Sequence, residues 1–496
     1  MLSKEASGRK EDINLIIIIT VVYIINVFSV EFPIIGILIG VFAIIILLIL
    51  FFSGQLESYI LYLILFMTTG FEVSAFALYE GEIYSFLKLP GLGSYHIFFL
   101  SILPTLLFTR KKAKFYLNEI NKFGDLSKYN KGMFWLIIIG IIFGLLSLLF
   151  NDNDVQNSSI HFSHTRQELI SFVSVFLLGL YISFFLVSSP QFSNKLERLL
   201  RCILVSLLPS SIITIILGLH GYYSGNKTIL MPLVIFFGVT LMIFPFYSDY
   251  FNRKRYFFNG FILFLIILIF PSPLGGKWWL LIMIIPTIWI INTLYRLNVK
   301  KLIYLNFILP IAIILIITFS LIDHSGQKWE NNLSQKKFDQ AISSFNIWEN
   351  NWFENLPNSP KFRIDEFINI LFEYNEKPQY LLFGKGFGGS LTQHTSFLDW
   401  NQTDAFSIEQ IREGRYFRLH FALNKIFLKF GLIGLFYYIS IFILCLKGIK
   451  KNPWVLLGLI WFLMYFDYYI SLNFGLFCLL LGLFKNEKKR KLYLKK

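Results

Sequence analysis

Long apolar runs separated by short polar breaks cover most of the chain. A membrane hydrocarbon core of about 30 Å is crossed by roughly 20 apolar residues in a helix. Fourteen runs, several of them short, are therefore expected to be transmembrane helices. They lie near residues 13–30, 33–52, 56–71, 95–109, 133–150, 168–188, 199–219, 229–247, 256–271, 277–295, 301–322, 424–446, 453–467 and 470–484. Because Asp467 lies at the junction of the last two runs, the pattern predicts an all-α polytopic membrane protein with about 14 helices (12–14).

The distribution of basic residues predicts how these helices are oriented. If the N-terminus is cytoplasmic, 29 of the 45 Lys and Arg residues fall in cytoplasmic segments, whereas the short loops opposite hold only Lys88, Arg166, Lys227 and Lys277. Basic residues accumulate on the cytoplasmic side of membrane proteins, so both termini are predicted to be cytoplasmic. The net charge of +15 has this topological origin, and no nucleic-acid partner is expected.

One long segment, 323–421, differs from the rest and is predicted to lie outside. Its residues up to 419 include 10 basic and 13 acidic residues, and four of the ten tryptophans. It contains two amphipathic helical patterns, around 338–352 and 367–374, so we expect a folded helical loop domain. The predicted organisation is transmembrane helices 1–11 in 1–322, the loop domain in 323–421, helices 12–14 in 422–484, and a basic cytoplasmic tail in 485–496.

His420 is the first candidate for chemistry, because it stands at the outer surface just before a predicted span and ten residues separate it from Gly431. A neutral imidazole can accept a proton from an attacking sugar hydroxyl. The alternative is that His420 only makes interfacial hydrogen bonds.

Two cations are candidates for binding an anion. Arg363 precedes Phe367 and Ile370 on a predicted amphipathic helix, and its planar guanidinium suits a phosphate or diphosphate. The alternative is a salt bridge with Glu366. Lys277 begins a span within the sequence LGGKWWLL, where an unpaired cation is costly, although a lysine can also extend to lipid phosphates without further function.

Two other motifs favour ordinary turns. Gly384, Gly386, Gly388 and Gly389 are not followed by the lysine that a phosphate-binding P-loop requires, so a flexible or tightly bent connection is expected. Asp152 and Asp154 have a spacing that could hold a divalent ion, but a turn is the simpler interpretation, and no metal site is predicted.

The arrangement of these features resembles the O-antigen polymerase and O-antigen ligase superfamily. Its members have a multi-helix membrane domain and a large periplasmic loop near the C-terminal end. That loop holds an arginine on a helix, a Gly-x-Gly turn, and a histidine, often followed by Asn, Ser or Gln, with nine more residues before Gly-x-x-Gly. In this chain, Arg363 resembles the family's arginine, the sequence GKGFGG at 384–389 resembles the turn, and His420 with Gly431 and Gly434 resembles the histidine motif. Lys277 after Gly275 and Gly276 takes the place of an arginine in the family, and Phe421 replaces a polar residue common in ligases.

The resemblance implies a glycosyltransferase C-like (GT-C-like) membrane fold in the bacterial inner membrane. It implies metal-independent transfer of a glycan from an undecaprenyl diphosphate carrier to an acceptor hydroxyl, with no cofactor. His420 would be catalytic, and Arg363 and Lys277 would bind the substrate diphosphate. Arg418 and Arg415 are secondary candidates for binding the diphosphate, because they precede His420 by two and five residues. The expected partners are carrier-linked donor and acceptor glycans, membrane lipids and a possible chain-length regulator.

Three functions remain open within this interpretation. Phe421 and the long loop favour a polymerase of repeat units over a ligase that transfers the glycan to lipid A-core. A flippase for lipid-linked oligosaccharides is a weaker alternative, because the spans hold few charges away from their ends.

Overall fold

The protein was analysed as a computed structural model. The structure describes residues 11–22, 24–25, 33–68, 71–75, 82–84, 100, 102–103, 113–149, 158–189, 191–216, 227–230, 353, 356, 358–395, 397–400, 406, 408–417, 419, 421–449, 452–464 and 474–494. The chain divides into two compact units, Met1–Ile229 with Asp365–Lys496, and Leu230–Ile364. Most described residues belong to the first unit.

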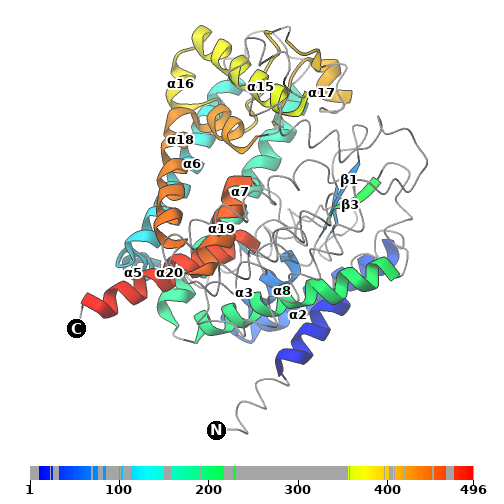
Figure 1. Cartoon of the computed structure of the whole chain (residues 1–496), viewed down its shortest axis with the longest axis vertical. Helices are drawn as coiled ribbons and strands as arrows, with labels where there is room; N and C mark the ends of the chain where they lie inside the picture. The colour runs from blue at the N-terminus through cyan, green and yellow to red at the C-terminus, as the bar shows by residue number, and fades with distance from the viewer. Residues whose placement is uncertain are drawn as a thin grey trace, which may run out of the picture. The chain divides into compact units, whose positions relative to one another are not determined.

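The described residues are nearly all helical (Figure 1). The helices are α2 (Pro33–Phe52), α3 (Leu56–Thr68), α5 (Ala113–Asn121), α6 (Gly124–Leu149), α7 (Ser158–Ser188), α8 (Phe192–Ile216), α15 (Asn358–Glu376), α16 (Gln379–Phe383), α17 (Ile408–Glu413), α18 (Ala422–Ile449), α19 (Pro453–Met464) and α20 (Phe474–Leu494). The strands β1 (Phe71–Ala75), β2 (Glu82–Tyr84) and β3 (Lys227–Leu230) form one small sheet in the order β2-β1-β3. Strands β1 and β2 are antiparallel, with Glu72 opposite Ile83.

Three of these helices are long and apolar enough to cross a membrane: Gly124–Ser147, His164–Ser188 and Ala422–Gly448. They coincide with three of the predicted spans, and the chain is accordingly a helical membrane protein. Shorter apolar stretches occur at Gly40–Phe52 and Leu56–Leu65. The spans predicted near 256–271, 277–295 and 301–322 lie outside the described residues, as does the span near 229–247 apart from residues 229 and 230, which end β3.

The polar segment 110–131, which lies between the predicted spans 95–109 and 133–150, is partly helical. It contains α5 and the beginning of α6, whose first residues are held by the far end of the chain: Glu487 on α20 accepts hydrogen bonds from the backbone N–H groups of Gly124 (2.6 Å) and Asp125 (3.1 Å). The first N–H groups of a helix have no partner within it, so this carboxylate stabilises the start of α6. Residues 485–494, predicted to form a separate tail, continue α20.

A glycine-rich turn at 384–389 packs against α6. The backbone N–H of Phe387 donates to the carbonyl of Gly140 (2.9 Å), and a side chain at Gly140 would overlap the Phe387 ring. Gly386 has φ +73°, and an added Cβ would lie 2.0 Å from the backbone nitrogen of Gly144. Glycines are therefore required on both sides of the contact, because the two backbones approach closely. The bend expected at 384–389 is confirmed.

The same turn completes the hydrogen bonding of a bend in α18. Gly431 has φ +57° and ψ −151° inside this helix, so the carbonyls one turn earlier lose their usual helical partners. The N–H groups of Lys385 and Gly386 donate to the carbonyls of Leu428 (2.8 Å) and Lys429 (2.9 Å). The Tyr374 hydroxyl donates to the carbonyl of Phe427 (2.7 Å). The bend is thus satisfied by residues of α15 and of the turn that follows α16.

Replacing Gly386 by alanine should destabilise the protein by at least about 3 kcal/mol, because the new Cβ would meet α6 backbone atoms as well as the positive φ. Gly414→Ala is the matched control. Gly414 also has positive φ (+63°), but no atom lies within 4 Å of the Cβ position, so about 1 kcal/mol is expected. Thermal unfolding of both purified variants measures the difference, and equal losses would contradict the packing argument.

Candidate active site

A polar face of α15 holds the segment that follows the glycine turn. Asp365 and Asn369 are fully buried on this face. Asp365 accepts hydrogen bonds from the Trp400 indole (2.7 Å) and from the Thr395 hydroxyl. Asn369 donates to the Thr395 hydroxyl (2.8 Å) and accepts from the backbone N–H of Thr395 (3.0 Å). These bonds fix Thr395 and Trp400 against α15.

A second contact joins this segment to the residues that lead into α18. Leu391 and Tyr416 form an antiparallel bridge, with two N–H···O bonds of 2.9 Å. The Tyr416 ring packs edge-on against the buried Trp400, with ring centroids 4.7 Å apart. Arg415, next to Tyr416, is thereby positioned beside the segment at 390–394.

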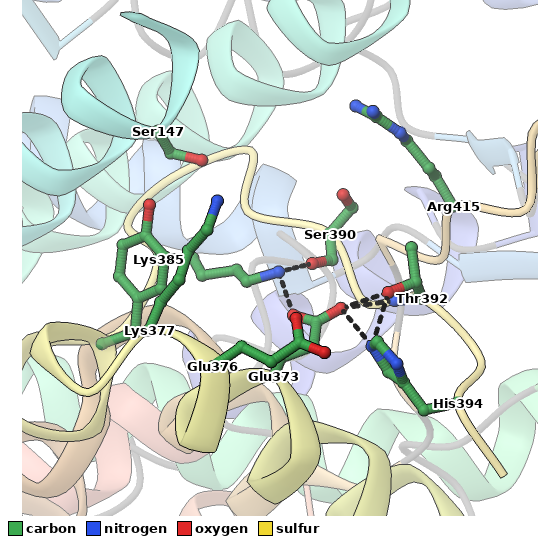
Figure 2. A pocket seen from close by; sticks show the side chains of 10 residues that line it. Ser147, Glu373, Glu376, Lys377, Lys385, Ser390, Thr392, His394 and Arg415 are labelled. Atoms are coloured by element: carbon green, nitrogen blue, oxygen red, sulfur yellow. Dashed lines mark hydrogen bonds and ion pairs between the residues drawn. The ribbon is translucent and has the colours of Figure 1, made fainter. Parts of the chain in front are cut away.

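Between these elements lies a polar cavity of about 150 Å³ (Figure 2). The residues that line it come from α6, α15, α16, the glycine turn and the segments at 390–394 and 415. They are Ser147, Glu373, Glu376, Lys377, Tyr380, Lys385, Ser390, Thr392, His394 and Arg415.

Glu373 is the centre of the cavity's hydrogen bonding. Its carboxylate pairs with the ammonium of Lys385, and it accepts hydrogen bonds from the Thr392 backbone N–H (2.7 Å) and hydroxyl (2.6 Å). His394 lies beside it, with Nε2 2.9 Å from the Thr392 hydroxyl and 3.7 Å from the carboxylate. Lys385 also donates to the carbonyl of Ser390 (2.7 Å). Figure 2 shows this cluster, with Lys377 and Arg415 on opposite sides of it.

The charges in this cluster shift each other's ionisation. Burial tends to raise the pKa of Glu373, but the Lys385 charge and the hydrogen bonds from its neighbours outweigh burial and lower the pKa to about 2. The hydrogen bond with Glu373 raises the pKa of His394 above its ordinary 6.5, despite partial burial. Glu373 therefore stays ionised at neutral pH and is a weak base, whereas His394 favours its cationic form more than a free histidine does.

A second buried ion pair lies under the glycine turn. The Lys429 ammonium on α18 is 2.8 Å from the Glu168 carboxylate on α7 and donates to the carbonyl of Gly389 (2.7 Å). Glu168 also accepts from the backbone N–H of Gly388 (2.7 Å). The Lys429 side chain is only 2% exposed. Buried charges need such compensation, so this pair ties α7, α18 and the turn together.

The structure describes two of the five residues proposed from the sequence. Arg415 lines the cavity. Arg363 is half-buried near the start of α15 and belongs to the unit Leu230–Ile364. His420, Arg418 and Lys277 lie outside the described residues, and their roles stay predictions. Glu366, the alternative partner of Arg363, is fully buried and accepts a hydrogen bond from Asn424 (3.0 Å).

The metal candidates Asp152 and Asp154 also lie outside the described residues. Within the described part of the chain, no group of three or more His, Cys, Asp or Glu residues has a geometry suited to a metal ion. His164, which follows these aspartates in the sequence, is on α7 and stacks on the Phe417 ring with centroids 4.3 Å apart.

Sequence reasoning missed Glu373, Lys385 and His394. One signal was present: Asp365, Glu366, Asn369 and Glu373 recur at helical spacing, which indicates a polar stripe on α15 aimed at partners rather than at water. The pairing of this stripe with Lys385 and His394 depends on the turn and could not be read from spacing.

Glu373→Gln should destabilise the protein by about 3–5 kcal/mol, because it leaves the Lys385 ammonium buried without its counter-charge. The folded pKa of Glu373 is below its ordinary 4.5, so its contribution is complete above that pH and is lost as the pH falls toward 2. The difference in free energy of unfolding between Glu373→Gln and wild type should therefore be largest near about pH 6 and become smaller at about pH 4 and 3. Glu376→Gln, three residues away and exposed, should change stability by less than about 0.5 kcal/mol; a pH-independent difference for Glu373→Gln would contradict the assignment.

Glu168→Gln should also destabilise the protein, by about 3–5 kcal/mol, because the amide keeps the bond to Gly388 but leaves Lys429 without a counter-charge. The double variant Glu168→Gln with Lys429→Met should regain much of this loss, since no unpaired charge remains. Thermal unfolding of wild type, the two single variants Glu168→Gln and Lys429→Met, and the double variant tests the coupling. Additive losses in the double variant would show that the pair is not coupled.

The sequence matches no protein-family model and no curated protein.

Proposed function

We propose that the protein polymerises undecaprenyl-diphosphate-linked oligosaccharide repeat units at the outer face of the bacterial cytoplasmic membrane. The product would be a polysaccharide of the O-antigen or capsule type. The reaction is a metal-independent glycosyl transfer between two carrier-linked glycans.

The observation that carries this proposal is the docking of the glycine turn on the bend of α18. In the motif that the chain resembles, a Gly-x-Gly turn and a Gly-x-x-Gly helix flank the histidine. Here Lys385 and Gly386 of the turn bond to α18 carbonyls just before Gly431. The intervening segment thus starts and ends at one place in the fold, which supports a single site made from these motifs.

The proposed roles follow from the chemistry of each side chain. His420 accepts the proton of the acceptor hydroxyl, whose oxygen forms a bond to the anomeric carbon of the donor glycan. The bond between that carbon and the diphosphate oxygen breaks, and undecaprenyl diphosphate leaves with both bonding electrons. Arg363, Lys277 and Arg418 offset the charge of this leaving group. Arg415, which the sequence also suggested for the diphosphate, lines the cavity beside Glu373 instead. A chain-length regulator is a further partner in this proposal.

The contacts of α6 at its first residue and in its second half are compatible with the predicted topology. Gly124 contacts Glu487, and both are predicted to be cytoplasmic. Gly140 and Gly144 contact the turn that is predicted to be outside. α6 and α18 run side by side between these contacts (Figure 1), as two spans would.

A ligase that transfers the finished glycan to lipid A-core is the second candidate, because it shares the same motifs. Phe421 in place of a polar residue favours the polymerase. A flippase has no need for a folded segment with the buried polar network around Asp365 and Glu373.

The proposal is tested in a deletion strain complemented with wild type or with His420→Ala, by gel analysis of surface and carrier-linked polysaccharide. A polymerase predicts single-repeat glycans in the deletion and in His420→Ala, because loss of a general base slows the reaction by about 10²–10⁴. Long chains stranded on the carrier would indicate the ligase.

His161→Ala, on α7 and predicted to lie on the same outer side, is the matched control and should restore the normal ladder. Expression of each variant is checked by immunoblot. A normal ladder from well-expressed His420→Ala would contradict the catalytic role of this histidine.

A further inference from the structure

We propose that the cavity lined by Lys385, His394 and Arg415 binds a sugar ring that carries a carboxylate, such as a hexuronate residue of the repeat unit. This inference rests on the proposed function for the source of the sugar. It adds a specificity site to that reaction, gives roles to His394 and to Lys385 of the glycine turn, and moves Arg415 from the leaving diphosphate to a sugar of the repeat unit.

The size of the cavity limits its ligand to about one ring. A cavity of about 150 Å³ equals roughly five times the volume of a water molecule in the liquid, and a cavity of this size in another protein accommodates benzene. A single pyranose ring therefore fits, with the rest of an oligosaccharide extending out of the cavity. A long glycan can bind only through one of its residues.

The polar lining favours a polyhydroxylated ring over an apolar one. Four hydroxyl side chains line the cavity, together with cations that donate and carboxylates that accept: Ser147, Tyr380, Ser390 and Thr392. Apolar ligands remain in water rather than enter a site whose polar groups they leave without partners. Sugar hydroxyls can donate and accept, so they match both kinds of group.

The charge of the lining favours an anionic substituent on that ring. Lys377, Lys385 and Arg415 contribute three positive charges, against Glu373 and Glu376. Glu373 is used within the protein, since Lys385 and Thr392 surround its carboxylate. Lys377 and Arg415 stand on either side of this neutralised pair in Figure 2, and His394, whose side chain is 28% exposed, adds positive charge when protonated. With Lys385 and Glu373 paired, Lys377 and Arg415 against Glu376 leave one net positive charge to attract a carboxylate, and protonated His394 adds to it.

Two of the cations are held in place before a ligand arrives. Lys385 is fixed by Glu373 and the carbonyl of Ser390, and His394 by Thr392. The backbone beside Arg415 is fixed by the bridge of Tyr416 to Leu391. Binding to an ordered set of charges loses little conformational entropy, which favours recognition of one sugar residue with modest contact area.

The test measures how small probes bind to the full-length protein purified in detergent. Binding is monitored by ligand-observed NMR titration. The probes are methyl β-D-glucuronide, the neutral methyl β-D-glucoside and inorganic pyrophosphate. Wild type should bind the glucuronide at least about ten-fold more tightly than the glucoside, since one charge-assisted contact has about this effect.

Arg415→Gln should weaken glucuronide binding about ten-fold and leave glucoside binding within about two-fold. Lys377→Gln, an exposed position on the other side of the cavity, should weaken glucuronide binding in the same sense. Lys122→Gln is the control: this lysine is exposed, pairs with Glu119 and is remote from the lining residues, so both affinities should be unchanged.

Equal affinity for the two glycosides, or glucuronide binding that Arg415→Gln leaves intact, would overturn the inference. Tighter, Arg415-dependent binding of pyrophosphate that displaces the glucuronide would also overturn it and assign the cavity to the carrier diphosphate. The outcome is independent of the polysaccharide gel. Arg415-dependent glucuronide binding with a normal ladder in the deletion strain would reject the polymerase but keep the site.

Discussion

The described part of the structure depends on the backbone carbonyls that lose their helical hydrogen bonds at the bend of α18. A helix that changes direction at Gly431 leaves carbonyls without helical partners, and such groups are costly when buried. Tyr374 and the backbone of Lys385 and Gly386 donate hydrogen bonds to these carbonyls. The bend, α15 and the glycine turn therefore require one another, since none has complete hydrogen bonding without the others.

Two buried ion pairs stand on either side of this turn. Glu373 with Lys385 faces the cavity, and Glu168 with Lys429 lies against the membrane helices. Each pair brings together residues from different elements, so the charges fix the register of the turn as well as neutralise each other. Buried ion pairs add less to stability than to the definition of a unique arrangement in some proteins. Here that arrangement orients the polar lining of the cavity.

The sequence predicts the membrane class and several helices because their signal is local. A run of apolar residues specifies a span without reference to the rest of the chain, as for α6, α7 and α18, and helical periodicity in the same way predicts α15. The cavity is different. Glu373, Lys385 and His394 come together only because a turn with three positive-φ glycines, Gly384, Gly386 and Gly388, reverses the chain against two helices. Arg415 was found from its proximity to His420 in the sequence, whereas its neighbours needed the fold.

The contact between Glu487 and the start of α6 constrains the order of biosynthesis. The two partners are 363 residues apart, and a chain grows at about 5–20 residues per second, so α6 waits about 20–70 s for its capping carboxylate. During that interval α6 is inserted without its final partner, and a translocon or neighbouring helix must keep its first N–H groups hydrated or paired. α20 thus completes a helix that is made long before it, and truncation ahead of Glu487 would leave the start of α6 without this partner.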